Sequence, residues 1–238
     1  MEIQPIAHFR SPFKSKFGIP RQSGLVETLR GRIVFEPSFS DADSLRGLEG
    51  FDYLWLIWGF SAHVDAPKSS TVRPPRLGGN RRLGVWATRS PFRPNNLGLS
   101  SVRLVAVDAV RMEVEVAGAD LMDGTPIYDI KPYVEYADSH VGVRSGFTDQ
   151  TEWQQLEVCL PSPLAQMLDP LQREALTQAL ALDPRPRYHG DAGRTYGMPF
   201  DRWDVRFRVE GRVLTVLALE PAADGCSVEA DDHNGEAH

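Results

Sequence analysis

The sequence predicts a mainly β protein: a single-sheet antiparallel β-barrel in the N-terminal part, followed by a smaller α+β domain. Three observations support this class. The first 136 residues contain six or seven short segments with strand character, separated by turns rich in Gly and Pro. Alternating strand and helix patterns, which a doubly wound fold requires, are absent there. Helical spacing of apolar residues occurs mainly later, in residues 162–184.

The first half of the barrel can be assigned segment by segment. Weak alternation in residues 3–13 and a short run bounded by Gly and Pro at 31–37 predict two strands, joined by the basic loop 14–24. In residues 38–51, Ser and Asp precede a short apolar period, which predicts a helix of one or two turns starting near Ser40 or Asp41. The aromatic, continuous run 51–61 predicts a central strand.

The second half of the barrel follows a basic stretch. Residues 99–110 and 111–118 both alternate, and the short connection between them predicts an antiparallel hairpin. Residues 120–136 predict a turn around Asp123 and Gly124, then a short strand and a Lys-Pro-Tyr exit. These strands complete the predicted barrel.

The C-terminal part has a different character. A polar linker at 139–152 leads to a short strand at 156–161. The helical pattern of 162–184 is interrupted by Pro170 and predicts one or two helices. A basic loop, 185–201, and a hairpin, 203–221, follow. We therefore expect a barrel domain, an α+β domain and a disordered acidic tail, at residues 1–145, 152–221 and 222–238.

Composition excludes several classes of protein. Of the 238 residues, 42% are hydrophobic and 24% charged, as in ordinary globular proteins. No run of apolar residues has the length of a signal peptide core or a membrane span. Cys159 and Cys226 lie far apart, and no Cys/His cluster has the spacing of metal ligands. We expect a cytoplasmic protein with no membrane segment and no metal site.

Charge is distributed unevenly along the chain. Residues 1–100 carry 14 Lys and Arg against 8 Asp and Glu, whereas the remainder carries 12 against 24. The stretch 66–100 contains seven Lys and Arg but no acidic residue. This pattern indicates a surface for an anion such as RNA, although a solvated charged surface would have the same composition.

Common catalytic motifs are missing. The chain has no GxSxG elbow, no P-loop lysine motif and no HExxH, and its Gly78-Gly79 pair lacks the setting of a dinucleotide fingerprint. Polar residues and turns concentrate in three loops, 14–24, 71–98 and 120–133. In a small barrel these loops could meet at one end, where such folds usually bind ligands.

Three strings in these loops identify a family. KFGIPRQSG (16–24), TVRPPRLGGNRRLGVWATRSPFRPNNLGLS (71–100) and DLMDGTPIYDIKPY (120–133) resemble the TsaA/TrmO (YaeB-like) family of tRNA methyltransferases. The resemblance covers residues 3 to 136. RPRYHGDAGRTYGMPFDRWDVRFRV (185–209) also resembles the C-terminal extension of the bacterial members.

The resemblance implies a specific reaction. Members of the family use S-adenosyl-L-methionine to methylate N6 of threonylcarbamoyladenosine, next to the anticodon of threonine tRNA. They are single-sheet barrels that form homodimers, with the cofactor near the subunit interface. Residues 61 and 62 depart from the family pattern, in which His-Gln is expected. The implied cofactor contacts are Gln22, Ser23, Gly24, Ser61, Ala62, Arg89, Leu99, Asp120, Leu121, Met122, Asp123, Gly124 and Thr125.

The residue types give these contacts chemical sense. Methyl transfer from a sulfonium is an in-line displacement, so positioning carries most of the catalysis. Arg89 could pair with the methionine carboxylate, and Trp86 or Phe92 could stack on adenine, although core packing is the favoured role of Trp86. Asp123 could accept from ribose hydroxyls or the ammonium. By residue type the candidate bases are Asp129, Tyr128 and His63, which the sequence does not rank.

Basic residues on the same loops are candidates for binding RNA, and each could instead tie loop carbonyls together. They are Arg76, Arg81, Arg82, Arg93, Lys131 and Arg194. Two other functions are compatible with the sequence: a tRNA-binding module without catalysis, and a methyltransferase for an anionic small molecule. Donor binding separates the first from an enzyme, and salt dependence separates the second from an RNA-modifying enzyme.

Overall fold

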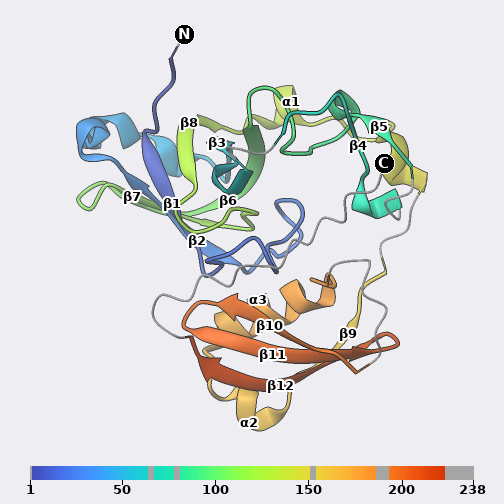
Figure 1. The fold of residues 1–238 in the computed structure, drawn as a ribbon. Helices are drawn as coiled ribbons and strands as arrows, with labels where there is room; N and C mark the ends of the chain where they lie inside the picture. Colours follow the sequence, from blue (N-terminus) through green and yellow to red (C-terminus); the bar gives the residue numbers. More distant parts are fainter. Residues whose placement is uncertain (1, 64–66, 78–80, 151–153, 186–192, 223–238) are drawn as a thin grey trace.

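A computed structural model of the chain describes residues 2–63, 67–77, 81–150, 154–185 and 193–222. The chain forms a β-barrel and a second, smaller sheet that lies beside it with its own helices (Figure 1). This confirms the predicted mainly β class, with an antiparallel barrel followed by an α+β part. The acidic tail beyond residue 222 lies outside the described residues, and the domain limits at 145 and 152 stay predictions.

The barrel is a closed sheet of six antiparallel strands in the order β1-β2-β7-β6-β3-β8. Strand β3 pairs with β6 on one side and with β8 on the other, so the predicted central strand is confirmed. A separate pair, β4 (Thr71–Val72) and β5 (Leu83–Gly84), lies in the basic stretch. The barrel strands are β1 (Ala7–Arg10), β2 (Arg30–Phe35), β3 (Tyr53–Gly59), β6 (Leu97–Asp108), β7 (Glu113–Ala117) and β8 (Pro126–Pro132).

Alternating residues of these strands fill the barrel. Phe9, Ile33 and Leu56 are among the side chains buried in its core. Two glycines make room for the large rings. A Cβ at Gly31 would lie 2.2 Å from the Phe9 ring, and a Cβ at Gly98 would lie 2.3 Å from the Trp58 ring. Larger residues at these two positions would therefore displace the core aromatics.

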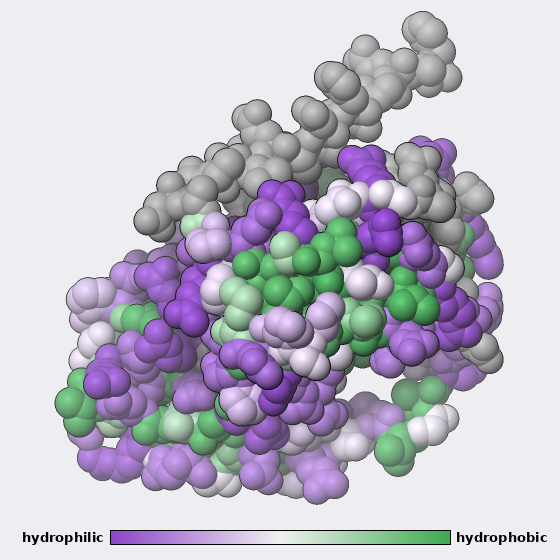
Figure 2. Space-filling model, turned by 90° about the horizontal axis from the view of Figure 1, so that it is seen from below, coloured by the Kyte–Doolittle hydropathy of each residue, from purple (hydrophilic) through white to green (hydrophobic). Residues whose placement is uncertain are grey.

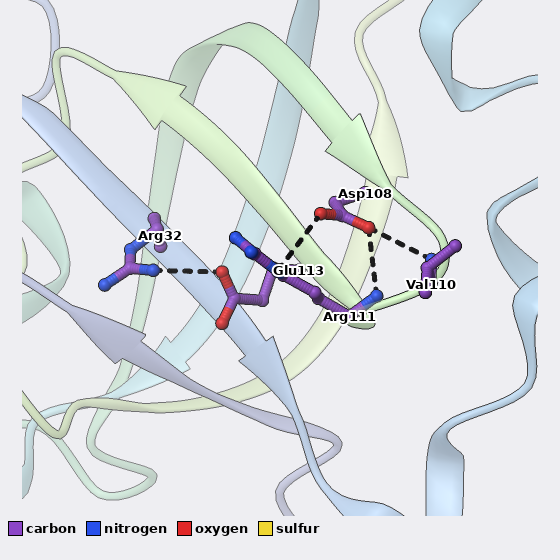
Figure 3. Close-up of polar contacts among 5 residues, drawn as sticks. All are labelled: Arg32, Asp108, Val110, Arg111 and Glu113. Atoms are coloured by element: carbon purple, nitrogen blue, oxygen red, sulfur yellow. Dashed lines mark hydrogen bonds and ion pairs between the residues drawn. The ribbon is translucent and has the colours of Figure 1, made fainter.

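The predicted hairpin is formed by β6 and β7 (Figure 3). Asp108 closes its turn: Oδ1 accepts from the backbone N–H groups of Val110, at 3.1 Å, and Arg111, at 2.9 Å. Beside the turn, Arg32 Nη1 of β2 donates to Glu113 Oε2 at 3.0 Å. Because one aspartate accepts hydrogen bonds from two backbone amides of the turn, the short connection between β6 and β7 is fixed in one conformation.

The short helix predicted near Ser40 or Asp41 is present, but as a 3₁₀ turn and not as an α-helix. It is the second of three 3₁₀ turns in this segment, Pro37–Phe39, Ala42–Leu45 and Leu48–Gly50. Asp41 is the N-cap of the second, since its side chain accepts from the Asp43 N–H at 3.0 Å. Gly47, at φ 87°, then interrupts the chain before an α-helix can form.

The basic stretch continues beyond β5 in a tight turn. After the two residues of β5 the chain enters a 3₁₀ turn, Val85–Ala87. Val85 is buried, but Trp86 is 74% exposed, so the prediction that Trp86 packs in a core is wrong. Of the two large residues in this turn, Val85 is the one directed inward, and Trp86 points to the outside.

The linker region is partly structured. Residues Glu135–Asp138 form one turn of helix, α1, and residues Gly146–Gln150 form a 3₁₀ turn inside the expected polar linker. The Asp138 side chain accepts from the Val134 N–H at 2.8 Å and stabilises the start of α1.

The C-terminal sheet has four strands in the order β10-β11-β12-β9. Pro170 does not interrupt a helix but begins α3, where Asp169 and Gln172 form a capping box. Residues 195–200, expected as part of a loop, form β10, and their alternate burial matches a strand. The elements are β9 (Glu157–Cys159), α2 (Ser162–Ala165), α3 (Pro170–Ala181), β10 (Thr195–Phe200), β11 (Trp203–Glu210) and β12 (Val213–Pro221).

The core of this second sheet includes residues from the N-terminal part. Phe13, Val26 and Leu29 are buried together with α3 and strands β10 to β12. On the outside, seen from the side of α2 and β12, Figure 2 shows apolar residues gathered among hydrophilic ones. The large apolar residues exposed in this part of the chain are Met167, Leu171, Val213 and Leu217.

Candidate functional site

The three polar loops meet, as the sequence predicts. Arg89 Nη1 donates to Gln22 Oε1, although the two residues are 67 positions apart. The backbone N–H of Ser23 lies near enough to the carboxylate of Asp120 to favour its charged form, and the guanidinium of Arg89 acts on that carboxylate in the same direction. Four of the predicted cofactor residues, one or two from each loop, therefore form one connected cluster, which we call the loop cluster: Gln22, Ser23, Arg89 and Asp120.

A hydrogen-bond chain from the barrel interior holds the Asp120 carboxylate. Ser100 Oγ lies 2.6 Å from Asp120 Oδ1 and donates to it, and Trp58 Nε1 donates to Ser100 Oγ at 2.9 Å. Ser100 and Trp58 are both buried. Burial raises the pKa of Asp120, while the hydrogen bonds from Ser100 and the Ser23 N–H and the charge of Arg89 oppose that rise.

Ser100 and Trp58 are the residues that sequence reasoning missed. A signal was present: Ser100 occupies an inward position of an alternating strand, and a buried hydroxyl requires a partner. The identity of that partner could not be read from the sequence. Asp120 lies in the connection between β7 and β8, and only the folded barrel brings this connection next to Ser100 of β6.

Two glycines bring the loop 14–24 against the barrel. The Gly24 N–H donates to the Gly118 carbonyl at 2.8 Å, with φ values of 81° and 78° for the two residues. A Cβ at Gly118 would lie 3.5 Å from the backbone of Gly24. That is an ordinary contact, so it is the positive φ values that explain why both positions carry glycine.

Residues 121–125 hold the end of β1 more than they face the loop cluster. Asp123 Oδ1 accepts from the Ser11 N–H at 3.1 Å, and its own N–H donates to the Phe13 carbonyl at 2.8 Å. The side chains of Leu121 and Thr125 are buried. Contacts to a ligand from this segment would therefore come from backbone groups and from the half-buried positions Met122, Asp123 and Gly124.

Three further predicted contacts lie on the outside of the barrel. Ser61 and Ala62 are exposed in a 3₁₀ turn, Ser61–His63, directly after β3. Leu99 of β6 is 55% exposed and lies opposite Ile57 of β3. In the parts of the chain that the structure describes, these three residues form no hydrogen bond or ion pair with the loop cluster.

The candidate bases are not equivalent. Asp129 Oδ2 lies 3.0 Å from Lys131 Nζ, and its Oδ1 accepts from the Ile130 N–H at 2.9 Å. The Tyr128 ring lies over Gly59, where a Cβ would be 2.9 Å from the hydroxyl oxygen. The side chain of His63 lies outside the described residues. This geometry singles out none of the three as a base.

The basic residues divide into structural and exposed ones. Arg93 donates to three loop carbonyls, those of Val85, Thr88 and Ser90, at 2.6–3.3 Å, and lies 5.8 Å from the Trp86 ring. It therefore shapes the loop. Arg81 is exposed, as is Arg82, which donates to Thr71 Oγ1 at 3.2 Å.

The other basic candidates are spread over the molecule. Lys131 pairs with Asp129 on β8, and Arg76 is half-buried in the 3₁₀ turn Pro75–Leu77. The Arg194 guanidinium lies 5.6 Å from the centre of the Tyr196 ring in the C-terminal part. Among the RNA-binding candidates in the basic stretch, Arg81 and Arg82 thus offer exposed positive charge for a phosphate backbone.

Two absences hold for the part of the chain that the structure describes. Three or more His, Cys, Asp or Glu side chains nowhere gather there in a group that could hold a metal ion. Within the same residues, every helix is too short or too polar to cross a membrane.

Both parts of the chain match family models. Residues 8–139 match the tRNA-methyltransferase O N-terminal domain, and residues 153–222 match the TrmO C-terminal domain. A tRNA (adenine(37)-N6)-methyltransferase of Escherichia coli K12 is 37% identical over 230 residues, which cover 92% of this chain and 98% of that protein. A human protein of the same name is 35% identical over 152 residues, 61% of this chain and 33% of the human one.

Relatives from Pseudomonas aeruginosa agree in sequence and structure. A protein named "Putative S-adenosylmethionine-dependent methyltransferase RcsF" is 41% identical over 210 residues. The match covers 85% of this chain and 89% of RcsF. The crystal structure of TrmO from that organism superimposes with a TM-score of 0.76 at 34% identity, covering 93% of this chain and 97% of the other.

Proposed function

Because this chain belongs to the TrmO family, we propose that it transfers a methyl group from S-adenosyl-L-methionine to N6 of threonylcarbamoyladenosine, next to the anticodon of threonine tRNA. The general activity is that of a tRNA (adenine-N6)-methyltransferase, the name carried by relatives that align along most of this chain. The threonylcarbamoyl group and the choice of threonine tRNA are the finer part of the proposal.

The loop cluster is the observation that carries this proposal. S-adenosyl-L-methionine supplies an activated methyl group on a sulfonium, and also has an ammonium and a carboxylate. Arg89 places one positive charge in the cluster and Asp120 one negative charge, each suited to an opposite end of the amino acid. The Gly24 and Gly124 backbones, both at positive φ, leave room for close approach of a ligand.

Catalysis at this site would come mainly from orientation. An in-line displacement requires the acceptor nitrogen behind the methyl group, so a rigid donor site raises the rate by removing orientational freedom. The Trp58-Ser100-Asp120 chain supplies such rigidity, because it ties the loop residue Asp120 through β6 to β3 with buried or half-buried groups. The proton on N6 must also leave, and its acceptor stays open among Asp129, Tyr128 and His63.

Mass spectrometry of tRNA nucleosides tests this function directly. Nucleosides from cells that lack the protein should lose the N6-methylated form of threonylcarbamoyladenosine and keep the unmethylated form. A wild-type copy should restore the methyl group, and a copy with Arg89→Ala should not. Unchanged nucleosides in the deletion strain would reject the substrate. Absence of any heat with millimolar donor in calorimetry would favour a tRNA-binding module without catalysis.

The exposed arginines of the basic stretch lead to a prediction about RNA binding. Arg81→Glu combined with Arg82→Glu should weaken tRNA binding about tenfold or more near 0.1 M salt, because two phosphate contacts become repulsive. Gel shift assays with threonine tRNA and an unrelated tRNA should show the same loss for both. The variant's affinity should also fall less steeply with salt than that of the wild type.

A matched control is available on the barrel. Arg46 and Arg111 are also exposed, and each pairs with an aspartate three residues before it. Arg46→Glu with Arg111→Glu makes the same change in net charge away from the basic stretch. Equal losses of affinity in the two double variants would show that net charge alone, and not this surface, governs RNA binding.

We extend the proposal to a homodimer in the cytoplasm, where tRNA is available. Trp86 and Leu99, both large and exposed, are surfaces that a second copy could cover close to the loop cluster. Light scattering after size exclusion should give twice the 26.5 kDa chain mass, and Trp86→Ala should lower it. A monomer at micromolar concentration would reject the dimer and leave the methyltransferase proposal intact.

A further inference from the structure

The loop that presents Gln22, Ser23 and Gly24 begins and ends in the core of the C-terminal sheet. Phe13 before the loop and Val26 and Leu29 after it are buried in that core. Phe17 and Ile19, inside the loop, pack against the same core. Residues 13–29 thus belong to the barrel in sequence but pack as part of the C-terminal sheet.

Strand β10 makes the specific contacts with this segment. The Phe200 ring meets the Phe13 ring edge-on, with 5.4 Å between centroids. The Asp201 N–H donates to the Pro12 carbonyl at 2.7 Å. At Gly18, which has φ 90°, a Cβ would lie 2.2 Å from Met198 Sδ, so the thioether occupies the space that a side chain would need. Met198 and Phe200 are both buried.

The middle of the same segment is attached to the barrel instead. The Gly24 N–H donates to the Gly118 carbonyl at 2.8 Å, and the Ser23 N–H acts on the Asp120 carboxylate. The side chains at both ends of the loop therefore pack on the C-terminal sheet, while its backbone is bonded to the barrel side at Phe13, Gly24 and Leu29. Movement of either end would shift the Ser23 and Gly24 amides relative to Asp120.

We propose that Met198 and Phe200 of β10 are positioning residues for this loop, through which the C-terminal sheet sets the affinity for S-adenosyl-L-methionine. The proposal builds on the donor site proposed above. Within the described residues, neither side chain forms a hydrogen bond or ring contact with the loop cluster, so their effect passes through Phe13 and Gly18. The smaller sheet then has a defined part in donor binding, separate from any contact with RNA.

Truncation of Met198 gives the central test. Met198→Ala removes the thioether that packs on Gly18, so the free protein's loop can occupy more conformations. Donor binding must then order the loop, which lowers the affinity. We expect the dissociation constant for S-adenosyl-L-methionine to rise about tenfold. The turnover rate at saturating donor should stay within about twofold, because the groups at the methyl group are unchanged. Met198→Leu, which conserves volume, should restore the affinity.

Leu214→Ala is the matched control. Leu214 is fully buried in the same core but lies on β12, two strands away from β10 in the sheet. It should lower the melting temperature as Met198→Ala does, yet leave donor affinity unchanged. Phe200→Leu is a milder change on β10 that keeps the test usable if Met198→Ala fails to fold.

Amide hydrogen exchange supplies a readout that does not depend on the donor. In Met198→Ala or Phe200→Leu, the amides of Ser23 and Gly24 should exchange about tenfold faster, while those of β3 and β6 keep their protection. In Leu214→Ala they should not change. Equal exchange at Ser23 and Gly24 in the wild type and both β10 variants would overturn the proposal.

Donor binding then separates the two proposals. If the wild type itself binds no S-adenosyl-L-methionine, the proposed function fails, while hydrogen exchange still decides whether β10 positions the loop. If exchange rises but donor affinity is the same in Met198→Ala and the wild type, the loop does not set that affinity, and the inference is wrong. Faster exchange together with weaker binding, absent from Leu214→Ala, supports it.

Discussion

Arg89→Ala should lower the affinity for S-adenosyl-L-methionine about 100-fold, measured by calorimetry. A charge-assisted bond to a carboxylate contributes roughly 1.5–3 kcal/mol, and 2.8 kcal/mol corresponds to about a factor of 100. Arg89 is also the hydrogen-bond partner of Gln22 and a source of positive charge beside Asp120. Its loss therefore disturbs the loops 14–24 and 120–133 as well as its own. Methylation of tRNA at limiting donor should fall by the same factor.

Two variants control for other effects of removing this arginine. Arg89→Lys keeps the charge but loses the planar guanidinium, so it should recover part of the affinity. Arg82→Ala removes an exposed arginine from the same basic stretch and should leave donor binding unchanged. The melting temperature of the Arg89→Ala protein should match that of the wild type, because the side chain is exposed. Wild-type donor affinity in this variant would exclude Arg89 as an anchor.

Local patterns predicted most of the barrel. Flanking Gly and Pro were sufficient for β2, a continuous aromatic run for β3, and alternation for the β6–β7 hairpin. Tertiary contacts decided the exceptions. Residues 195–200 form a strand because β11 pairs with them along their whole length, although their Gly and Pro content is typical of a loop.

The loop cluster was predictable in part. Turn-rich loops and a family resemblance brought Gln22, Ser23, Arg89 and Asp120 to attention, but not their contacts with one another. Those contacts depend on strand register, which places Ser100 opposite Leu56 and beneath Asp120. The packing of Phe13 on the distant β10 could not be anticipated, because a buried Phe is compatible with either core.

Replacement of Asp120 is expected to uncouple donor binding from pH. Burial raises the pKa of Asp120, so its carboxylate takes up a proton at a higher pH than an ordinary aspartate. If the ionised carboxylate attracts the cationic groups of S-adenosyl-L-methionine, affinity should be full above that raised pKa and fall as the pH drops through it. Asp120→Asn should show weak binding, about 100-fold below the wild type, at every pH.

Ser100→Ala tests the same carboxyl group by shifting the pKa of Asp120 while the carboxyl itself is kept. Ser100 donates to the carboxylate and favours its charged form, so removing the hydroxyl should raise the pKa of Asp120 further. Donor binding by this variant should then be lost at a higher pH than in the wild type. A pH midpoint that does not move in Ser100→Ala would show that another group controls binding.

The charge and stability of Asp120 can be tested separately. S-adenosyl-L-homocysteine lacks the sulfonium charge, so Asp120→Asn should reduce its affinity less than that of S-adenosyl-L-methionine.

The stability of the fold should depend on pH in the opposite direction to donor binding. A carboxyl whose pKa is raised on folding destabilises the folded state above that pKa, and the cost disappears as the pH falls. Asp120→Asn should therefore melt at an equal or higher temperature at neutral pH, by a few degrees at most. A lower melting temperature together with equal losses for the two ligands would assign Asp120 to the fold instead of to the donor site.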